Sequence, residues 1–177
     1  MNDQPTSLIP ADYTALLSDI KQRVRHGQTR AMLAVNAELI RLYWDIGALI
    51  HARQQQEGWG TGVIPRLARD LHNELPEEKG FSERNIKRML AFYREYPQLQ
   101  FVPQAVAQVE PDPKGPQAAA LFPVDLVQSI PWGHHTELMA QVKDLPTRHW
   151  YMQACLANGW SRNILLIDRK STRLNSS

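Results

Sequence analysis

Apolar residues recur at intervals of three and four from about Thr29 to Gln56, and this period most constrains what the chain can form. Alternating steps of three and four bring side chains onto one face of an α-helix. The seam consists of Met32, Val35, Leu39, Leu42, Ile46 and Leu49, and Leu33, Ile40, Tyr43 and Ile50 widen it. So broad an apolar face must be covered on more than one side. The pattern fits the central helix of a bundle, and it also fits a homodimer seam.

Local start and stop signals predict further helices on both sides of the seam. The segment 11–26 follows Pro10 and is ended by Gly27, which separates it from the seam helix. A third helix is expected over 62–74, and later helices follow in the second half of the chain. The sequence therefore predicts an all-α, multi-helix domain with no substantial sheet.

Changes in composition divide the chain into four parts. Residues 1–97 form a helical region, and five prolines make 98–124 a linker or loop. Residues 125–167 form a second helical part of the same domain. The last ten residues, DRKSTRLNSS at 168–177, match the translation of a common sequencing adapter. We expect this tail to be adapter-derived and the natural chain to continue past Ile167.

Bulk composition says little about partners but narrows the compartment. The chain has 20 Lys and Arg against 18 Asp and Glu. Omitting the terminal ten residues removes three basic residues and one acidic residue, which leaves 17 of each. Only local clusters of charge can then point to a partner. Cys155 is the one cysteine, no apolar run reaches membrane-spanning length, and the start lacks signal-peptide features, so we expect a cytoplasmic protein without a membrane partner.

The stretch GFSERNIKRMLAFYREYP predicts a short helix with two unlike faces. Ser82 is a good N-cap, and Phe81 with Ile86 has the spacing of a hydrophobic staple. At 100° per residue the apolar side chains gather on one side, and four basic residues gather on the other. A solvated surface helix is also charged, but its charges are usually of mixed sign. Pro97 ends the helix.

The helix over 62–74, a turn of about seven residues and this basic helix together resemble a helix-turn-helix unit at 62–97. The turn is longer than usual. In such a unit the first turn of the second helix points at base edges, and cations further along contact phosphates. The predicted DNA-binding residues are Arg66, Arg69, Ser82, Arg84, Asn85, Lys87, Arg88 and Arg94.

Other chemistry is not indicated. His134 and His135 are adjacent, so on a helix they point about 100° apart and cannot easily face one metal ion. We expect both to cap or pack, and we expect Cys155 to act as a small buried hydrophobe. No motif for a catalytic site, cofactor site or metal site is present, and this fragment is not expected to be an enzyme.

Several long motifs together carry a family resemblance. YWDIGALI, GWGTGVIPRLARDLHNELPEEKGFSERNIKRMLAFYREYP, IPWGHH and VKDLPTRHWYMQACLANGWSRNIL resemble, in order and spacing, the N-terminal domain of bacterial YhcG-type proteins, also known as the DUF1016 N-terminal domain. The resemblance covers residues 11–167 except the proline-rich part. It implies a helical domain that precedes a PD-(D/E)XK nuclease domain. The catalytic residues and Mg²⁺ of that domain belong to the part missing here.

These features together predict a domain that binds double-stranded DNA and targets the absent nuclease. The alternative is a helical module for protein–protein interaction or dimerisation, in which the seam helix pairs with a second copy and the basic face is merely solvated.

Overall fold

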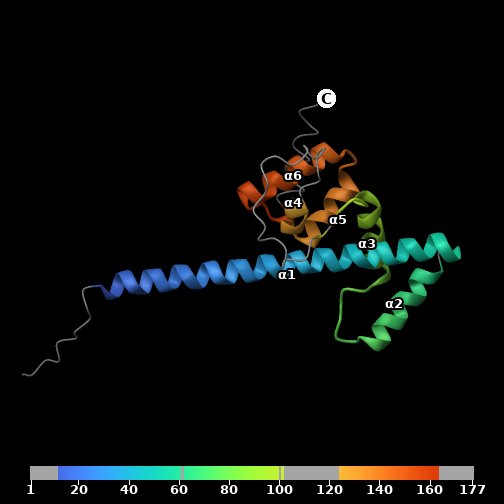
Figure 1. Ribbon diagram of the computed structural model, residues 1–177, viewed down its shortest axis with the longest axis horizontal. Helices are drawn as coiled ribbons and strands as arrows, with labels where there is room; N and C mark the ends of the chain where they lie inside the picture. The colour runs from blue at the N-terminus through green and yellow to red at the C-terminus, as the bar shows by residue number, and fades with distance from the viewer. Residues whose placement is uncertain (1–11, 61, 100, 102–123, 164–177) are drawn as a thin grey trace, which may run out of the picture. The chain divides into compact units, whose positions relative to one another are not determined.

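The computed structural model describes residues 12–60, 62–99, 101 and 124–163 (Figure 1). Its helices are α1 (Tyr13–Glu57), α2 (Val63–Glu74), α3 (Glu83–Glu95), α4 (Val124–Ser129), α5 (Trp132–Gln141) and α6 (Leu145–Asn158). No β-strand occurs within these ranges, which confirms the all-α class. Most of the proline-rich part and the whole terminal tail lie outside the described residues.

The chain divides into two units, Met1–Val35 and Asn36–Ser177, and the division falls within α1. The predicted break at Gly27 is wrong, because α1 runs through that residue without interruption. A glycine inside a helix costs only about 1 kcal/mol relative to alanine, and its neighbours here are mostly good helix formers. Only a proline would have ended the helix reliably.

The second unit contains a first core between the C-terminal part of α1, α2 and α3. Its fully buried members are Tyr43, Ile50, Ile64, Ile86, Met89 and Leu90. Gly47 lies where α1 and α3 approach most closely: a Cβ atom at that position would lie 2.3 Å from the carbonyl oxygen of Met89. The helices can therefore pack at this distance only because residue 47 has no side chain.

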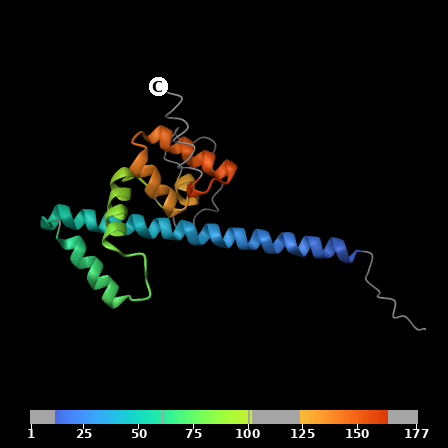
Figure 2. The same cartoon turned by 180° about the vertical axis from the view of Figure 1, so that it is seen from behind.

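A second core joins α3 to α4, α5 and α6. Phe92 and Tyr96 of α3 and its C-cap pack with Val127, Ile130 and Met152, all nearly free of solvent exposure. In Figures 1 and 2, α2 lies on one side of α1 and α4–α6 lie on the other, with α3 reaching both groups. The basic helix thus contributes to both cores, as α1 does through Ile40 and Tyr43, and this packing fixes its orientation within the second unit.

The predicted seam is split between core and surface. Leu39 and Ile46 pack against the first core, whereas Leu42 and Leu49 are 45% and 61% exposed. The face of α1 that the second unit buries instead carries Ile40, Tyr43, Gly47 and Ile50. Periodicity located the helix correctly but did not identify which side of it faces the core.

Candidate nucleic-acid interface

The start of α3 is fixed by the predicted local signals. Ser82 has extended backbone geometry, and its Oγ accepts a hydrogen bond from the backbone N–H of Asn85 at 3.3 Å. Phe81, just before the cap, packs against the cluster that contains Ile86. The cap satisfies one of the free N–H groups of the first turn, and the staple sets the direction in which the chain enters the helix.

Burial of one side of α3 leaves its opposite side exposed. Ile86, Met89 and Phe92 have no exposed surface. The opposite side carries four basic side chains, which we call the α3 basic strip: Arg84, Lys87, Arg88 and Arg94. Of these, Arg88 is half-buried and the other three are exposed. The structure therefore brings four predicted contacts onto one face.

Two members of the strip have weak partners, and two have none in the described part of the chain. Lys87 Nζ lies 2.6 Å from Glu83 Oε1, and Arg94 Nη2 donates to Gln54 Oε1 at 3.0 Å. Arg84 and Arg88 make no ion pair or hydrogen bond with residues that the structure describes. An exposed pair four residues apart contributes only about 0.3–0.5 kcal/mol, so a phosphate can replace Glu83 as the partner of Lys87.

The two arginines of α2 are less available as a cationic site. Arg66 Nε and Arg69 Nε both lie near Asp70, at 3.6 Å and 3.8 Å, so the three residues together carry one positive charge. Both arginine side chains are largely exposed, at 78% and 69%. Because two arginines share a single carboxylate, α2 can add to a positive field but contributes less than α3.

The side chain of Asn85 has partners within the protein, and its contact with DNA stays a prediction. Its Nδ2 donates to the carbonyl of Gly80 at 2.6 Å, and its Oδ1 accepts from Trp132 Nε1 at 2.8 Å. The amide is thus engaged within the protein, where it ties the turn before α3 to the start of α5. We leave Asn85 out of the proposed contact surface for this reason.

The turn of the helix-turn-helix-like unit is acidic as well as long. Eight residues separate the end of α2 at Glu74 from the start of α3 at Glu83. Glu77, Glu78 and Lys79 are exposed within this turn, which gives it one net negative charge. Carboxylates at the turn repel a polyanion, so contact is expected along the strip of α3 rather than across the turn.

The adjacent histidines serve packing, as expected. His134 Nε2 lies 2.9 Å from the carbonyl oxygen of Trp160, and His135 Nε2 lies 2.9 Å from that of Val127. Burial lowers the pKa of His135 to about 4. Cys155 is buried too, and burial raises the pKa of its thiol. No group of three or more potential metal ligands occurs among the described residues.

Sequence reasoning missed a buried cation. Arg148 of α6 has no exposed surface; its Nη1 lies 3.1 Å from Glu95 Oε2, and its Nη2 donates to the carbonyl of Val142 at 2.8 Å. Its guanidinium also lies 5.5 Å from the ring centroid of Tyr96. These contacts join α6 to the end of α3. Because the contacts come from distant parts of the chain, no local pattern could have revealed them.

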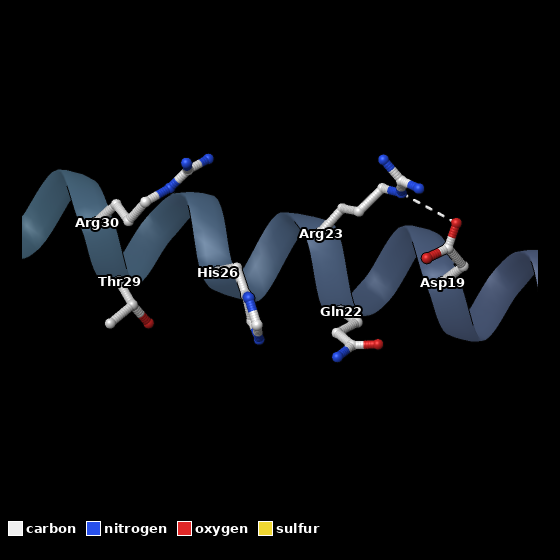
Figure 3. A pocket seen from close by; sticks show the side chains of 6 residues that line it. All are labelled: Asp19, Gln22, Arg23, His26, Thr29 and Arg30. Carbon is white, nitrogen blue, oxygen red and sulfur yellow. Dashed lines mark hydrogen bonds and ion pairs between the residues drawn. The ribbon is translucent and has the colours of Figure 1, made fainter.

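A hollow on the first unit does not form a second site. Asp19, Gln22, Arg23, His26, Thr29 and Arg30 line it. Figure 3 shows all six projecting from a single helix, with Arg23 paired to Asp19 at 2.9 Å. Side chains from one helix cannot enclose a small ligand, so this is a surface depression.

In the described part of the chain, no helix combines the length and apolarity that crossing a membrane requires.

These features define an all-α domain whose most available chemistry is a cationic strip on one helix. The chain belongs to the DUF1016 N-terminal domain family, whose model matches residues 19–174. The matched range includes part of the terminal tail, whose origin from an adapter stays a prediction. Comparisons with curated proteins and with solved structures found no match.

Proposed function

We propose that this domain binds duplex DNA through the α3 basic strip and so targets a nuclease domain encoded further along the natural chain. The proposal rests on one observation: Arg84 and Arg88 lie on the outer side of α3 and have no ion-pair or hydrogen-bond partner among the described residues. Cations left unpaired on one helix face are available to phosphates, and phosphate contacts supply most of the affinity of sequence-independent DNA binding.

The shape of the element supports a duplex as the polyanion. An α-helix with its side chains is about 10–12 Å wide and enters the major groove of B-DNA, which is about 12 Å wide. Arg84 lies in the first turn, beside the positive end of the helix dipole. Ser82 Oγ accepts from its own helix and retains a hydroxyl proton that can be donated to a phosphate. Arg66 and Arg69 strengthen the positive field from α2.

A salt titration with charge reversal tests the proposal. The domain should bind random duplex DNA, and the logarithm of the affinity should fall with the logarithm of salt concentration by about 0.9 per phosphate contacted. Changing Lys87 and Arg88 to Glu should abolish binding and leave the helix content by circular dichroism unchanged. Because both residues face outward, loss of binding without loss of helix would locate the contact on α3.

Arg88→Glu alone should also weaken binding, and Lys143→Glu is the charge-matched control for this single variant. Lys143 is exposed between α5 and α6 and is not a member of the strip, and the substitution changes the net charge by the same amount. The control should keep nearly all of the affinity. Equal losses in the two variants would mean that only total charge matters, and unchanged binding by the double variant would disprove the role of the strip.

The targeting part of the proposal is tested by the natural reading frame. If the domain serves a nuclease of the PD-(D/E)XK type, sequencing past residue 167 should reveal an Asp and a Glu-x-Lys on adjacent predicted strands. Those side chains would hold the catalytic Mg²⁺, which the residues described here are not arranged to bind. A downstream sequence without these residues would leave a DNA-binding domain with another partner.

A further inference from the structure

The first unit carries an apolar stripe that its described residues, 12–35, leave exposed. Tyr13, Leu16, Leu17, Ile20 and Val24 are 36–55% exposed, and Val35 is 70% exposed. At 100° per residue these positions lie within an arc of about 100° on the helix. We call these six residues the N-terminal apolar stripe. It shares only Val35 with the seam predicted further along α1, part of which packs against the core of the second unit.

A lone helix with such a stripe is not expected to persist in water. The helical part of the first unit covers 13–35, and most of the stability of a helix in a protein comes from packing of its apolar face rather than from helix propensity. This segment includes Gly27 and Thr29, which both lower helix propensity. Exposed large apolar side chains on one side therefore indicate a partner that covers them.

The segment is complementary to a reversed copy of itself in charge. Between residues 12 and 20 the charged residues are Asp12 and Asp19, both acidic. Between residues 21 and 31 they are basic: Lys21, Arg23, Arg25 and Arg30. With Ile20 beside Val24 of the second copy, antiparallel pairing places Asp19 and Asp12 near Arg25 and Arg30 of that copy, and Lys21 and Arg23 lie near the two-fold axis, where they face their own counterparts. Parallel pairing would instead place four cations opposite four cations.

The sizes of the side chains also favour antiparallel over parallel pairing. If Ile20 of one helix lies beside Val24 of the other, Tyr13 meets Ala31 and Leu17 meets Gly27. A Cβ at Gly27 would have no neighbour within 4 Å, so the position is open on the monomer. Large residues opposite small ones fill the space between antiparallel helices, whereas parallel pairing sets glycine against glycine and leaves a void. We propose that the chain forms a homodimer by antiparallel pairing of the N-terminal apolar stripe with that of a second copy.

Light scattering and sedimentation on the full chain test the dimer. The parent should have twice the monomer mass at micromolar concentration. Leu17→Glu with Ile20→Glu should raise the dimer dissociation constant roughly a hundredfold or more, because a two-fold interface buries each substitution twice. Leu33→Glu is the matched control, since Leu33 is 49% exposed on the opposite side of the same segment and should leave the mass unchanged. All tryptophans lie in the second unit, so unchanged tryptophan-detected unfolding would show that this unit is intact.

Mixed disulfide formation tests the orientation. Thr14 and Gln28 flank the stripe and come together only between antiparallel chains in the register above. Equal amounts of Thr14→Cys and Gln28→Cys chains should give a covalent heterodimer under mild oxidation, and neither variant alone should cross-link. A monomeric parent at about 100 μM, a dimer unaffected by the paired Glu substitutions, or a dimer without the mixed disulfide would each overturn the proposal. A monomer whose stripe is protected from hydrogen exchange would show that the chain's own residues cover it.

Discussion

Arg148 Nη1 lies 3.1 Å from Glu95 Oε2, and this ion pair joins α6 to the last turn of the helix that carries the basic strip. The two partners differ in environment: the Arg148 side chain has no exposed surface, whereas 39% of the Glu95 side chain is exposed. The ion pair therefore neutralises the Glu95 carboxylate, which lies close to the strip. It also holds the C-terminal end of α3 against the second core.

Removing the buried cation should weaken the second unit more than removing its exposed partner. Arg148→Met removes the guanidinium that donates to the carbonyl of Val142 and to the hydroxyl of Tyr96, at an expected cost of about 2–4 kcal/mol in the free energy of unfolding. Glu95→Gln keeps a polar acceptor at a solvated position and should cost about 1 kcal/mol. Urea titrations at pH 7 measure both values, and the reverse order would contradict this account of the pair.

Stability of the second unit should fall in mild acid because of His135. The pKa of its folded form is about 4, owing first to burial, with the charges of His134 and Arg148 lowering it further. An unfolded histidine titrates near 6.5. Between these values the unfolded state binds a proton that the folded state does not, so the free energy of unfolding decreases as the pH falls from about 6.5 to about 4. The full decrease from this residue is about 3 kcal/mol.

The measurement is urea unfolding at several pH values, compared between the parent and His135→Gln. The variant lacks the titrating group, so it should lose this part of the pH dependence whatever its stability at pH 7. His72→Gln is the control, because His72 is exposed on α2 and should leave the slope as it is. A parent whose stability is flat between pH 6.5 and 4.5 would show that His135 is not buried as a neutral group.

Features that depend on a few neighbouring residues could be predicted from the sequence. Ser82 caps α3 as its type and spacing indicated. Gly159 ends α6 with a left-handed backbone, φ 62°, a conformation that glycine adopts without strain. The basic side of α3 was found in the same way, since a helix of known phase places its own side chains. Interactions between neighbouring residues determine these features, so the sequence alone is enough to predict them.

Features that depend on distant contacts could not be predicted. The position of Asn85 in the first turn predicts a base contact, but it does not indicate that Gly80 and Trp132 form hydrogen bonds with the Asn85 amide. The apolar residues of α1 outnumber those that one core can cover, and periodicity cannot say which of them face it. Arg148 gave no signal at all, because a buried arginine is defined by partners on other helices. In each case tertiary packing overrides the local pattern.

Two glycines of α1 should respond in opposite ways to alanine. Gly47→Ala would place a Cβ 2.3 Å from the Met89 carbonyl oxygen and 2.9 Å from Tyr93 Cβ, so α1 and α3 must separate. We expect a loss of about 1–3 kcal/mol in unfolding free energy, as for other overpacked cores. In the monomer Gly27→Ala meets no atom within 4 Å and should stabilise the helix by about 0.5–1 kcal/mol. In the proposed dimer the added methyl would meet Leu17 of the second copy, so the comparison is made at a concentration at which the chain is monomeric. Denaturant unfolding, detected by tryptophan fluorescence, measures the effect of Gly47→Ala. Hydrogen exchange over residues 13–35 measures the effect of Gly27→Ala. Equal effects would mean that helix propensity, not close packing, governs position 47.

Substitution of Asn85 should separate structure from DNA contact. Asn85→Ala leaves the carbonyl of Gly80 and the indole N–H of Trp132 without their partner, at an expected cost of about 1–3 kcal/mol in unfolding free energy. Asn85→Asp still accepts from Trp132 but sets a carboxylate oxygen against the carbonyl oxygen of Gly80, with no hydrogen between the two acceptors, so it should lose at least as much stability. Urea unfolding ranks the two, and the tryptophan emission should shift to longer wavelength more in the alanine variant. DNA affinity of the folded variants should stay within about twofold of the parent if Asn85 only holds the turn. A large, sequence-dependent loss of affinity with little loss of stability would restore Asn85 to the contact surface.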